Sequence, residues 1–312
     1  MSRTKLFIYL FLIIVLLALR ASAQNPDSLL NSLDQGNQFN KVEATFKATH
    51  IVLSHSTETQ KKHDMDLRIR HHFGDIGGEF GSAHTLYGLD VATDLFIGLD
   101  YGVTDRLTIG IGRSKHDELI NLYGKQKIFQ QQESGFPLNL TLLAQVGLMA
   151  RKPFSDTEFS SYGDRLSYFI QPIFSRKVTS RLSLAIMPSL LMRSLTISAN
   201  DPENLFALGF AGRIKLTKRL SFVADYTLVN GLSRPKNLPI ALYNPLGVGL
   251  EIETGGHIFS LNFMNSEYIT ENSFIANTRK SWEDGGVRFG FTISRNFSLF
   301  KSKNKDTKST IY

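Results

Sequence analysis

The sequence of 312 residues contains no cysteine, which excludes disulfides, thiol catalysis, Cys-based zinc sites and a lipid anchor on an N-terminal cysteine. Beyond residue 23, no segment approaches the run of about 18 apolar residues that a membrane-spanning helix requires. Nucleotide-binding loops, zinc-protease helices and nucleophile elbows are also missing. If the mature chain crosses a membrane, it therefore does so without helices.

Residues 1–23 have the parts of a secretory signal, namely a basic start, an apolar run over residues 6–19 and the small residues 21–23. The run is short for a membrane-spanning helix, and an uncleaved anchor is the alternative. Cleavage removes Arg3, Lys5 and Arg20 from the 35 basic residues and none of the 28 acidic ones, which leaves 32 basic residues and a net charge of +4. A charge this small does not favour nucleic acid as a partner.

A short phrase with the pattern apolar, Thr, polar, Arg, Leu, Ser or Thr recurs along the chain. Its spacing gives a step of about 38 residues, which suits a β-hairpin and its return loop. We interpret the phrase as a tight turn in which the Thr hydroxyl bonds its own backbone. Complete copies occupy residues 103–108, 178–183 and 216–221, a worn copy occupies 293–298, and two degenerate positions fall near 132–136 and 255–256.

Between these turns, apolar and polar residues alternate over runs of about ten residues, the length that a tilted strand needs to cross a bilayer. Counting from residues 65–73 to residues 287–297 predicts twelve strands, with fourteen as the alternative. The predicted fold is all-β, a closed antiparallel transmembrane β-barrel of up-and-down topology. Short periplasmic turns would join the strands at one end, and longer extracellular loops at the other would span residues 74–89, 150–164, 194–203, 230–243 and 267–285.

Alternation alone does not tell which face of the barrel looks outward. A lipocalin-like barrel would turn its apolar face inward, but an interior of about eight strands is the largest that side chains fill. Twelve strands with that orientation would enclose an apolar hole. We therefore expect the apolar face to meet lipid.

Pro172 and Pro188 fall in the middle of two predicted strands, on either side of the turn at Thr179. Each proline removes a donor from the strand ladder. We expect a locally weakened hairpin with a bulge or a kink.

Four stretches carry a resemblance to a known family: ATFKATHIV at residues 44–52, HSTET at 55–59, DLRIRHHFG at 66–74 and DYGVTDRLTIGIGR at 100–113. They resemble a bacterial envelope family of predicted β-barrels, domain of unknown function 5777. The resemblance continues through residues 171–172, 181–184 and Pro188. It implies an outer-membrane barrel and supplies no catalytic residues.

The polar face of the predicted strands would line the lumen with charges of both signs in near balance. Such a lining is compatible with a closed network of ion pairs or with a narrow polar channel, because buried charges need partners. The lumen-lining candidates are Asp66, Arg68, Arg70, His72, Asp94, Asp100, Lys125, Lys127, Arg165, Arg213, Lys215, Asp225, Glu251, Glu253 and Arg288.

The region that precedes the barrel contains a strand-like stretch, residues 44–53, which would add an odd thirteenth strand. We therefore predict that residues 44–58 form a plug or rim segment, with Lys47, His50, His55 and Glu58 as plug candidates. The predicted regions are a signal peptide at 1–23, an N-terminal periplasmic helix and plug region at 24–63 with the helix at 26–35, the barrel at 64–300 and a basic tail at 301–312.

Six of the eight histidines lie between residues 50 and 84. His71 and His72 would point to opposite faces of a strand, and His50 and His55 would also diverge in an extended segment. We therefore expect no metal site, with one metal or proton-linked site as the minority alternative.

His55, Ser56 and Glu58 are the residue types of a hydrolase triad, but neighbours in an extended segment do not converge. We expect no catalytic residues and no cofactor. The predicted function is that of an outer-membrane barrel of a diderm bacterium, a narrow channel or binding barrel for small solutes. A structural or partner-docking barrel and, last, a membrane-embedded hydrolase are the alternatives. The expected partners are the lipid bilayer and a small solute of unknown identity, and the oligomeric state stays open.

Overall fold

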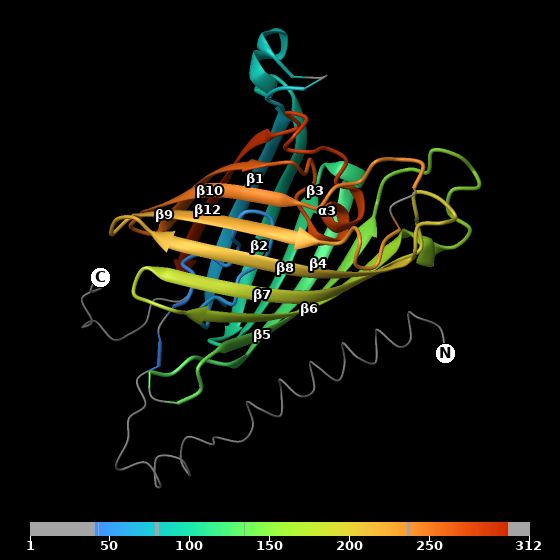
Figure 1. Cartoon of the computed structure of the whole chain (residues 1–312). Coiled ribbons are helices and arrows are strands. Elements are labelled where there is room, and N and C mark those ends of the chain that lie inside the picture. Colours follow the sequence, from blue (N-terminus) through green and yellow to red (C-terminus); the bar gives the residue numbers. More distant parts are fainter. Residues whose placement is uncertain (1–40, 43, 79–80, 134, 236–237, 299–312) are drawn as a thin grey trace.

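The computed structural model describes residues 41–42, 44–78, 81–133, 135–235 and 238–298. The predicted signal, the predicted helix at 26–35 and the basic tail lie outside these residues. Within the described part, the strands form one closed antiparallel barrel in which each strand pairs with its neighbours along the chain and β1 pairs with β12 (Figure 1). The strands are β1 (Asp64–Asp75), β2 (Ala92–Thr104), β3 (Leu107–Ser114), β4 (Leu119–Phe129), β5 (Asn139–Met149), β6 (Leu166–Lys177), β7 (Leu182–Arg193), β8 (Asn204–Lys215), β9 (Leu220–Leu228), β10 (Leu246–Thr254), β11 (His257–Met264) and β12 (Arg288–Ser298).

The predicted barrel class and the predicted number of twelve strands are confirmed. The register that closes the barrel runs from Asp64 opposite Ser298 to Asp75 opposite Arg288. Short helices lie in the connections: η1 (Ala83–Gly88), η2 (His116–Glu118), η3 (Tyr162–Arg165) and α3 (Glu271–Asn277). In the described part of the chain, no helix combines the length and the apolar character that crossing a membrane requires.

Most connections at one end of the barrel, which we call the short-turn end, are tight turns, and the β4–β5 connection there spans residues 130–138. In the β2–β3, β6–β7 and β8–β9 turns, the Oγ1 atoms of Thr104, Thr179 and Thr217 accept hydrogen bonds from the backbone N–H groups two and three residues later, at 2.9 to 3.3 Å. The predicted role of the threonines is therefore confirmed. The worn copy at residues 293–298 is not a turn, because these residues complete β12.

The opposite end, the long-loop end, carries the longer connections. The predicted asymmetry between the two ends is confirmed, since the loops at this end span residues 76–91, 150–165, 194–203, 229–245 and 265–287. One further connection at this end is short, at residues 115–118.

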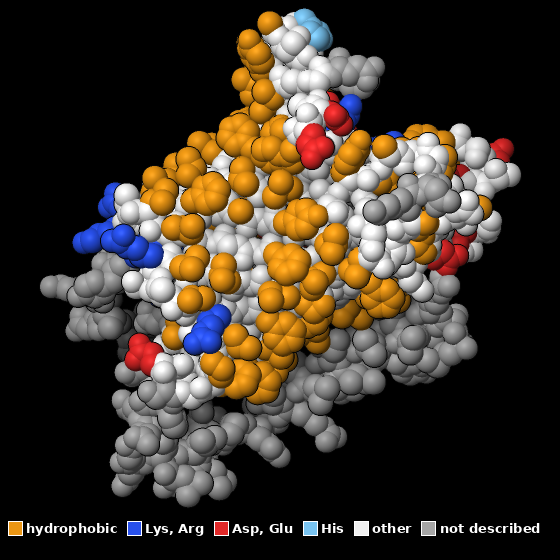
Figure 2. Space-filling model, viewed as in Figure 1, with side chains coloured by type: hydrophobic (Ala, Val, Ile, Leu, Met, Phe, Trp, Pro, Cys, Tyr) orange, Lys and Arg blue, Asp and Glu red, His pale blue; other side chains and the backbone are white. Residues whose placement is uncertain are grey.

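Apolar side chains cover the outside of the barrel. Figure 2 shows them over the strands, with most of the visible Lys and Arg side chains toward the short-turn end and most of the visible Asp and Glu side chains among the long loops. Burial alternates along each strand, so the exposed apolar positions form one outward face. Its members include Leu67, Ile97, Ile109, Ile111, Leu122, Leu184, Ile186, Phe206, Phe210, Ile214, Leu250, Leu261 and Phe263.

The interior is charged on one side and apolar on the other. Inward positions of β1, β2 and β4 carry buried ionisable groups such as Arg68, Asp100 and Lys125. By contrast, β6 and β7 turn fully buried apolar side chains inward, including Phe169 and Met187. The expectation that only polar residues look inward is therefore wrong for this side of the barrel, where inserted segments supply apolar partners.

The ladder between β6 and β7 is interrupted at its middle. Pairing stops after Ile170 opposite Leu190 and resumes at Phe174 opposite Ile186, in the same register. The expected weakening is present at the two prolines, but the register does not shift, so no bulge forms.

Candidate functional site: the occupied lumen

Two segments fill the interior of the barrel. We call residues 44–58, which enter from the short-turn end, the lumen segment, and residues 265–278, part of the β11–β12 loop, the loop insert. Residues 49–57 of the lumen segment are all buried, as are residues 271–276 of α3. Figure 1 shows α3 at the long-loop end and the lumen segment in blue behind the front strands. These two segments therefore occupy the lumen in this conformation.

The lumen segment folds back on itself instead of running extended. The backbone N–H of Ile51 donates to the Ser54 carbonyl at 2.8 Å, and that of Ser56 donates to the Thr49 carbonyl at 3.0 Å. This hairpin brings the His50 and His55 rings together, with centroids 3.8 Å apart. The expectation that these two histidines diverge is therefore wrong.

Asp225 of β9 holds the tip of this hairpin. Its Oδ2 atom accepts hydrogen bonds from the backbone N–H groups of Val52, Leu53 and Ser54, at 3.2, 2.8 and 2.8 Å. Successive N–H groups that converge on one oxygen form an anion-binding concavity. A single inward carboxylate thus fixes the position of the hairpin tip.

Arg70 and Lys125 bind the carbonyl side of the same hairpin. Lys125 Nζ donates to the carbonyls of Thr49 and Ser56, at 3.1 and 3.3 Å. Arg70 Nη2 donates to the Val52 carbonyl at 2.6 Å, and its Nη1 donates to the Ile269 carbonyl of the loop insert at 3.2 Å. Arg70 therefore contacts both segments at once.

Arg68 lies at the centre of a buried polar network on the charged side. Its Nη2 atom contacts the carboxylates of Asp66, at 3.1 Å, and of Asp100. The Tyr123 hydroxyl of β4 also donates to Asp100, and Arg68 Nη1 reaches His50 Nε2 at 3.0 Å. Opposite charges and hydrogen bonds offset the cost of burying these groups.

The contact with Arg68 fixes the protonation of His50. Arginine carries only donors, so His50 Nε2 must be the acceptor and the imidazole must be neutral. Burial, and after it the positive charge of Arg68, lowers the pKa of His50 well below 6.5. Geometry and charge therefore agree that the seated segment holds a neutral His50.

Two acids hold the loop insert in place, one from the wall and one from the insert itself. Asp94 of β2 accepts from the backbone N–H of Ile269 at 3.2 Å. Glu271 of α3 accepts from Gln145 Nε2 at 3.0 Å and lies 3.8 Å from His55 Nε2. Burial raises the pKa of Glu271. Sequence reasoning missed this insert, because residues 267–285 read only as a polar loop.

The remaining candidates form pairs closer to the two ends. Two ion pairs join the lumen segment to the wall. Lys127 of β4 pairs with Glu58 of the segment, and Glu253 of β10 pairs with Lys47 of the segment. Arg165 differs from the expectation, because it lies in η3 of the β5–β6 loop and donates to the Met149 and Arg151 carbonyls. The ion pairs are Lys127 with Glu58 at 3.4 Å, Lys47 with Glu253 at 2.8 Å, Arg213 with Glu251 at 3.1 Å and Arg288 with Asp75 at 2.7 Å, while His72 is buried and Lys215 half-buried.

The hydrolase residue types are not arranged for catalysis. The Ser56 hydroxyl donates to the Ala48 carbonyl at 2.6 Å, and the Glu58 carboxylate accepts from the Thr45 and Phe46 backbones. Among the described residues, no three His, Asp or Glu side chains gather as a metal would require. Ser56 and Glu58 therefore hold the fold of the lumen segment itself.

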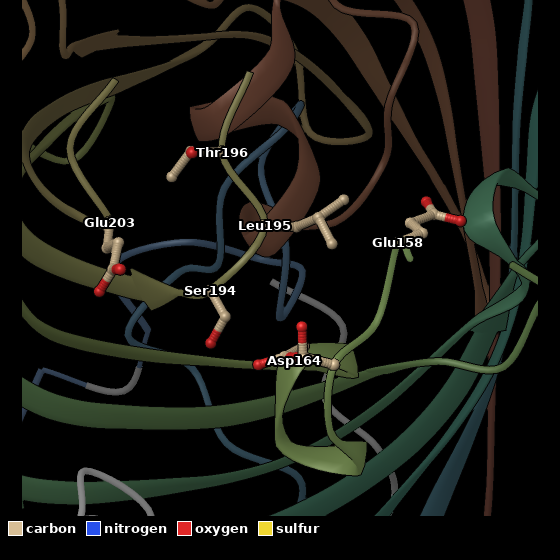
Figure 3. Close-up of a pocket in the computed structure, with 7 residues that line it drawn as sticks. Glu158, Asp164, Ser194, Leu195, Thr196 and Glu203 are labelled. Atoms are coloured by element: carbon tan, nitrogen blue, oxygen red, sulfur yellow. The ribbon is translucent and has the colours of Figure 1, made fainter. Parts of the chain in front are cut away.

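A pocket of about 590 Å³ opens at the long-loop end between the β5–β6 and β7–β8 loops. Figure 3 shows Glu158 and Asp164 on one side of it and Ser194, Leu195, Thr196 and Glu203 on the other. Glu158 is bound by Arg151, and Asp164 accepts from the Ser161 backbone at 2.8 Å. These acids therefore stabilise the loops that carry them.

The chain matches the model of a family described as "Membrane bound beta barrel domain (DUF5777)" over residues 46–297. Among solved structures it is similar to the NanC porin, with 10% identity, a TM-score of 0.45 and coverage of 75% of this chain and 100% of that one. It is also similar to the KdgM porin (7% identity, TM-score 0.42, coverage 76% and 99%) and to a mutant Rhodopseudomonas blastica porin (11% identity, TM-score 0.30, coverage 70% and 59%). A comparison with curated proteins found no match.

Proposed function

The chain belongs to the DUF5777 family of membrane-bound β-barrel domains, and on that premise we propose that it is a gated outer-membrane barrel for a small polar solute. The lumen segment is its gate. In this proposal the short turns face the periplasm, the long loops face outward, and residues 1–23 are removed on export.

The observation that carries the proposal is how the lumen segment is held. Wall residues Asp225, Lys125 and Arg70 bind mainly its backbone N–H and C=O groups. Water can replace each of these hydrogen bonds when the segment leaves, so the net cost of release is only about 0.5 to 3 kcal/mol per bond. The charged wall would then line an aqueous path.

A permanently closed structural barrel is the second candidate. It is favoured by the apolar contacts of the lumen segment and the loop insert. Phe46 and Leu53 of the lumen segment belong to one buried cluster with Phe274 of α3, and the wall residues Phe169 and Leu191 belong to the same cluster. Apolar burial of this kind stabilises the closed state by roughly 1.5 to 3 kcal/mol for each large side chain.

A disulfide lock separates the two candidates. Thr57 Oγ1 of the lumen segment lies 2.7 Å from Ser175 Oγ of β6, so Thr57→Cys with Ser175→Cys places two sulfurs close to bonding distance. The chain has no other cysteine to compete. In planar bilayers, the reduced variant should show conductance steps, oxidation should abolish them, and Ser175→Cys alone should ignore the redox state.

Deletions provide the second arm of this test. Removing residues 44–58 should raise conductance, and replacing residues 269–278 with a Gly-Ser linker in the same variant should raise it further. If the doubly opened barrel is folded and still passes no current, the barrel is structural and the proposed function is wrong.

A further inference from the structure

The interruption in the β6–β7 ladder has a simple geometric origin. In a register where Ile170 pairs with Leu190 and Phe174 with Ile186, Pro172 lies directly opposite Pro188. The pairs missing from the ladder are this one and its two neighbours. On their other sides both prolines remain paired, Pro172 with Leu142 and Pro188 with Leu208.

The loss of three successive pairs identifies the proline row as a hydrogen-bonded pair. In an antiparallel ladder such a pair exchanges both N–H···O=C bonds, and the flanking pairs depend on the same two bonds. Neither proline has an N–H to give. The carbonyls of Pro172 and Pro188 are therefore left without the ladder donors, and this row of the wall is held only by side-chain packing.

The interrupted row lies at the middle of both strands, each 12 residues long. The middle of a spanning strand is at the depth of the acyl chains, where water does not replace a missing donor. Outward neighbours are apolar, Phe174 and Ile186 among them. A polar solute from the water phase does not reach this row, whereas a hydrocarbon chain surrounds it.

Behind the row lies the apolar side of the lumen. Ile173 and Met187, which form one of the two missing pairs beside the prolines, face inward and are fully buried. They belong to one cluster with Phe169 and Leu191 of the wall and with the lumen segment. Gln171 is also buried here, and its Oε1 atom has no hydrogen-bond partner among the described residues. This oxygen is an acceptor, so it cannot replace the missing ladder donors.

We propose that the wall parts between β6 and β7 and admits one hydrocarbon chain of a membrane lipid into the apolar side of the lumen. The chain would contact Phe169, Ile173, Met187 and Leu191, in the space that apolar residues of the lumen segment share with them. This lateral route is detected by labelling and does not require conductance, so its failure can be told apart from the failure of the gated channel.

The test uses a phosphatidylcholine with a photoreactive diazirine at the middle of one acyl chain, in vesicles that hold the refolded full chain. After irradiation, peptide mass spectrometry should find adducts on the inward residues Met187 and Ile173, in addition to those on outward residues. Inward Val223 of β9 is the matched control position, because its ladders to β8 and β10 are uninterrupted. It should remain unlabelled.

Locking the row is the second arm. Ile170→Cys with Leu190→Cys places a disulfide across the outward pair next to the interrupted row. Oxidation should reduce the labelling of Met187 about tenfold or more, because β6 and β7 can then no longer part. Ile186→Cys with Phe210→Cys, on the uninterrupted β7–β8 ladder, should have no such effect. Pro172→Val with Pro188→Val, which restores both donors, should act like the lock.

Three results would overturn the proposal. One is the absence of inward adducts in the unlocked protein. Another is equal labelling of Val223 and Met187. The third is labelling that neither the oxidised lock nor the repaired ladder reduces.

Discussion

At the scale of single residues, Asp225 is the strongest attachment of the lumen segment, because one carboxylate oxygen accepts three backbone N–H groups. Asp225→Asn keeps the shape but removes the charge, and hydrogen bonds to an ionised acceptor are about twice as strong as neutral ones. We expect the free energy that favours the seated lumen segment to fall by about 1.5 to 3 kcal/mol. This raises the open probability in bilayers roughly tenfold to a hundredfold.

The matched control for this prediction is Glu251→Gln on the neighbouring strand β10. It removes an inward acid that pairs with Arg213, whereas the backbone N–H groups of residues 52–54 donate to Asp225. An equal rise in open probability in the control variant would contradict the role of Asp225, since it would reflect lumen charge in general.

The turn threonines give a second prediction at this scale. Thr179 Oγ1 accepts from the backbones of Arg181 and Leu182 at 3.2 and 3.0 Å. Thr179→Val removes this acceptor without changing the side chain's size, and we expect a loss of about 0.5 to 1.5 kcal/mol in the free energy of unfolding, measured in urea on the refolded barrel. Thr179→Ser keeps the hydroxyl and should restore wild-type stability. A valine variant as stable as the wild type would show that water replaces the hydroxyl without loss.

At the scale of elements, acidification is expected to release the lumen segment through His50. Burial, and after it the charge of Arg68, lowers the pKa of His50 in the seated segment, so on acidification His50 is protonated at a higher pH in the unseated segment than in the seated one. Seating is then fully stable above pH 6.5 and loses stability as the pH falls below it, by up to about tenfold in the equilibrium per pH unit. The measurement is the open probability between about pH 7.5 and pH 5.

His50→Gln keeps an acceptor for Arg68 and should weaken this acid response. Because burial, and after it the charge of Lys125, also lowers the pKa of His55 well below 6.5, His50→Gln together with His55→Gln should remove it. The groups facing the histidines also include Lys125 and Glu271, and Glu271 acts in the opposite direction, because its raised pKa makes the seated state bind that proton first. Glu271→Gln should therefore steepen the response. An acid response as large in His50→Gln as in the wild type would exclude His50 as its origin.

The outer wall of the barrel could be predicted from the sequence because lipid imposes a period of two on every strand. Apolar residues such as Ile97 and Phe210 alternate with inward residues, so they identify the outward face of a strand without knowledge of its neighbours. The hairpin of the lumen segment could not be predicted, because its bend depends on Asp225, which is distant in the sequence. The apolar interior had a local signal that went unused: in β6 and β7 the residues between the outward ones, such as Phe169 and Met187, are apolar as well.

At the scale of the whole molecule, the barrel closes without the lumen segment. All twelve strands are closed by ladders within residues 64–298, and β1 meets β12 without help from the lumen segment. The segment adds apolar contacts, but ordering its backbone costs about 1 to 2 kcal/mol per residue, so its net contribution to the stability of the barrel is small.

We therefore expect the barrel without residues 44–58 to refold into detergent and to resist SDS until it is heated, as the full chain should. Its midpoint of unfolding should fall by only a few degrees, because about 1 kcal/mol corresponds to roughly 2 to 4 °C for a chain of this size. Asp225, Arg70 and Lys125 would then face water in an open lumen, where their charges are solvated and no burial cost arises. A deletion variant that fails to refold or loses its resistance to SDS would show that the segment acts as a core and not as a removable gate. Asp225→Asn, which leaves the chain length unchanged, would distinguish that result from a defect of the new junction.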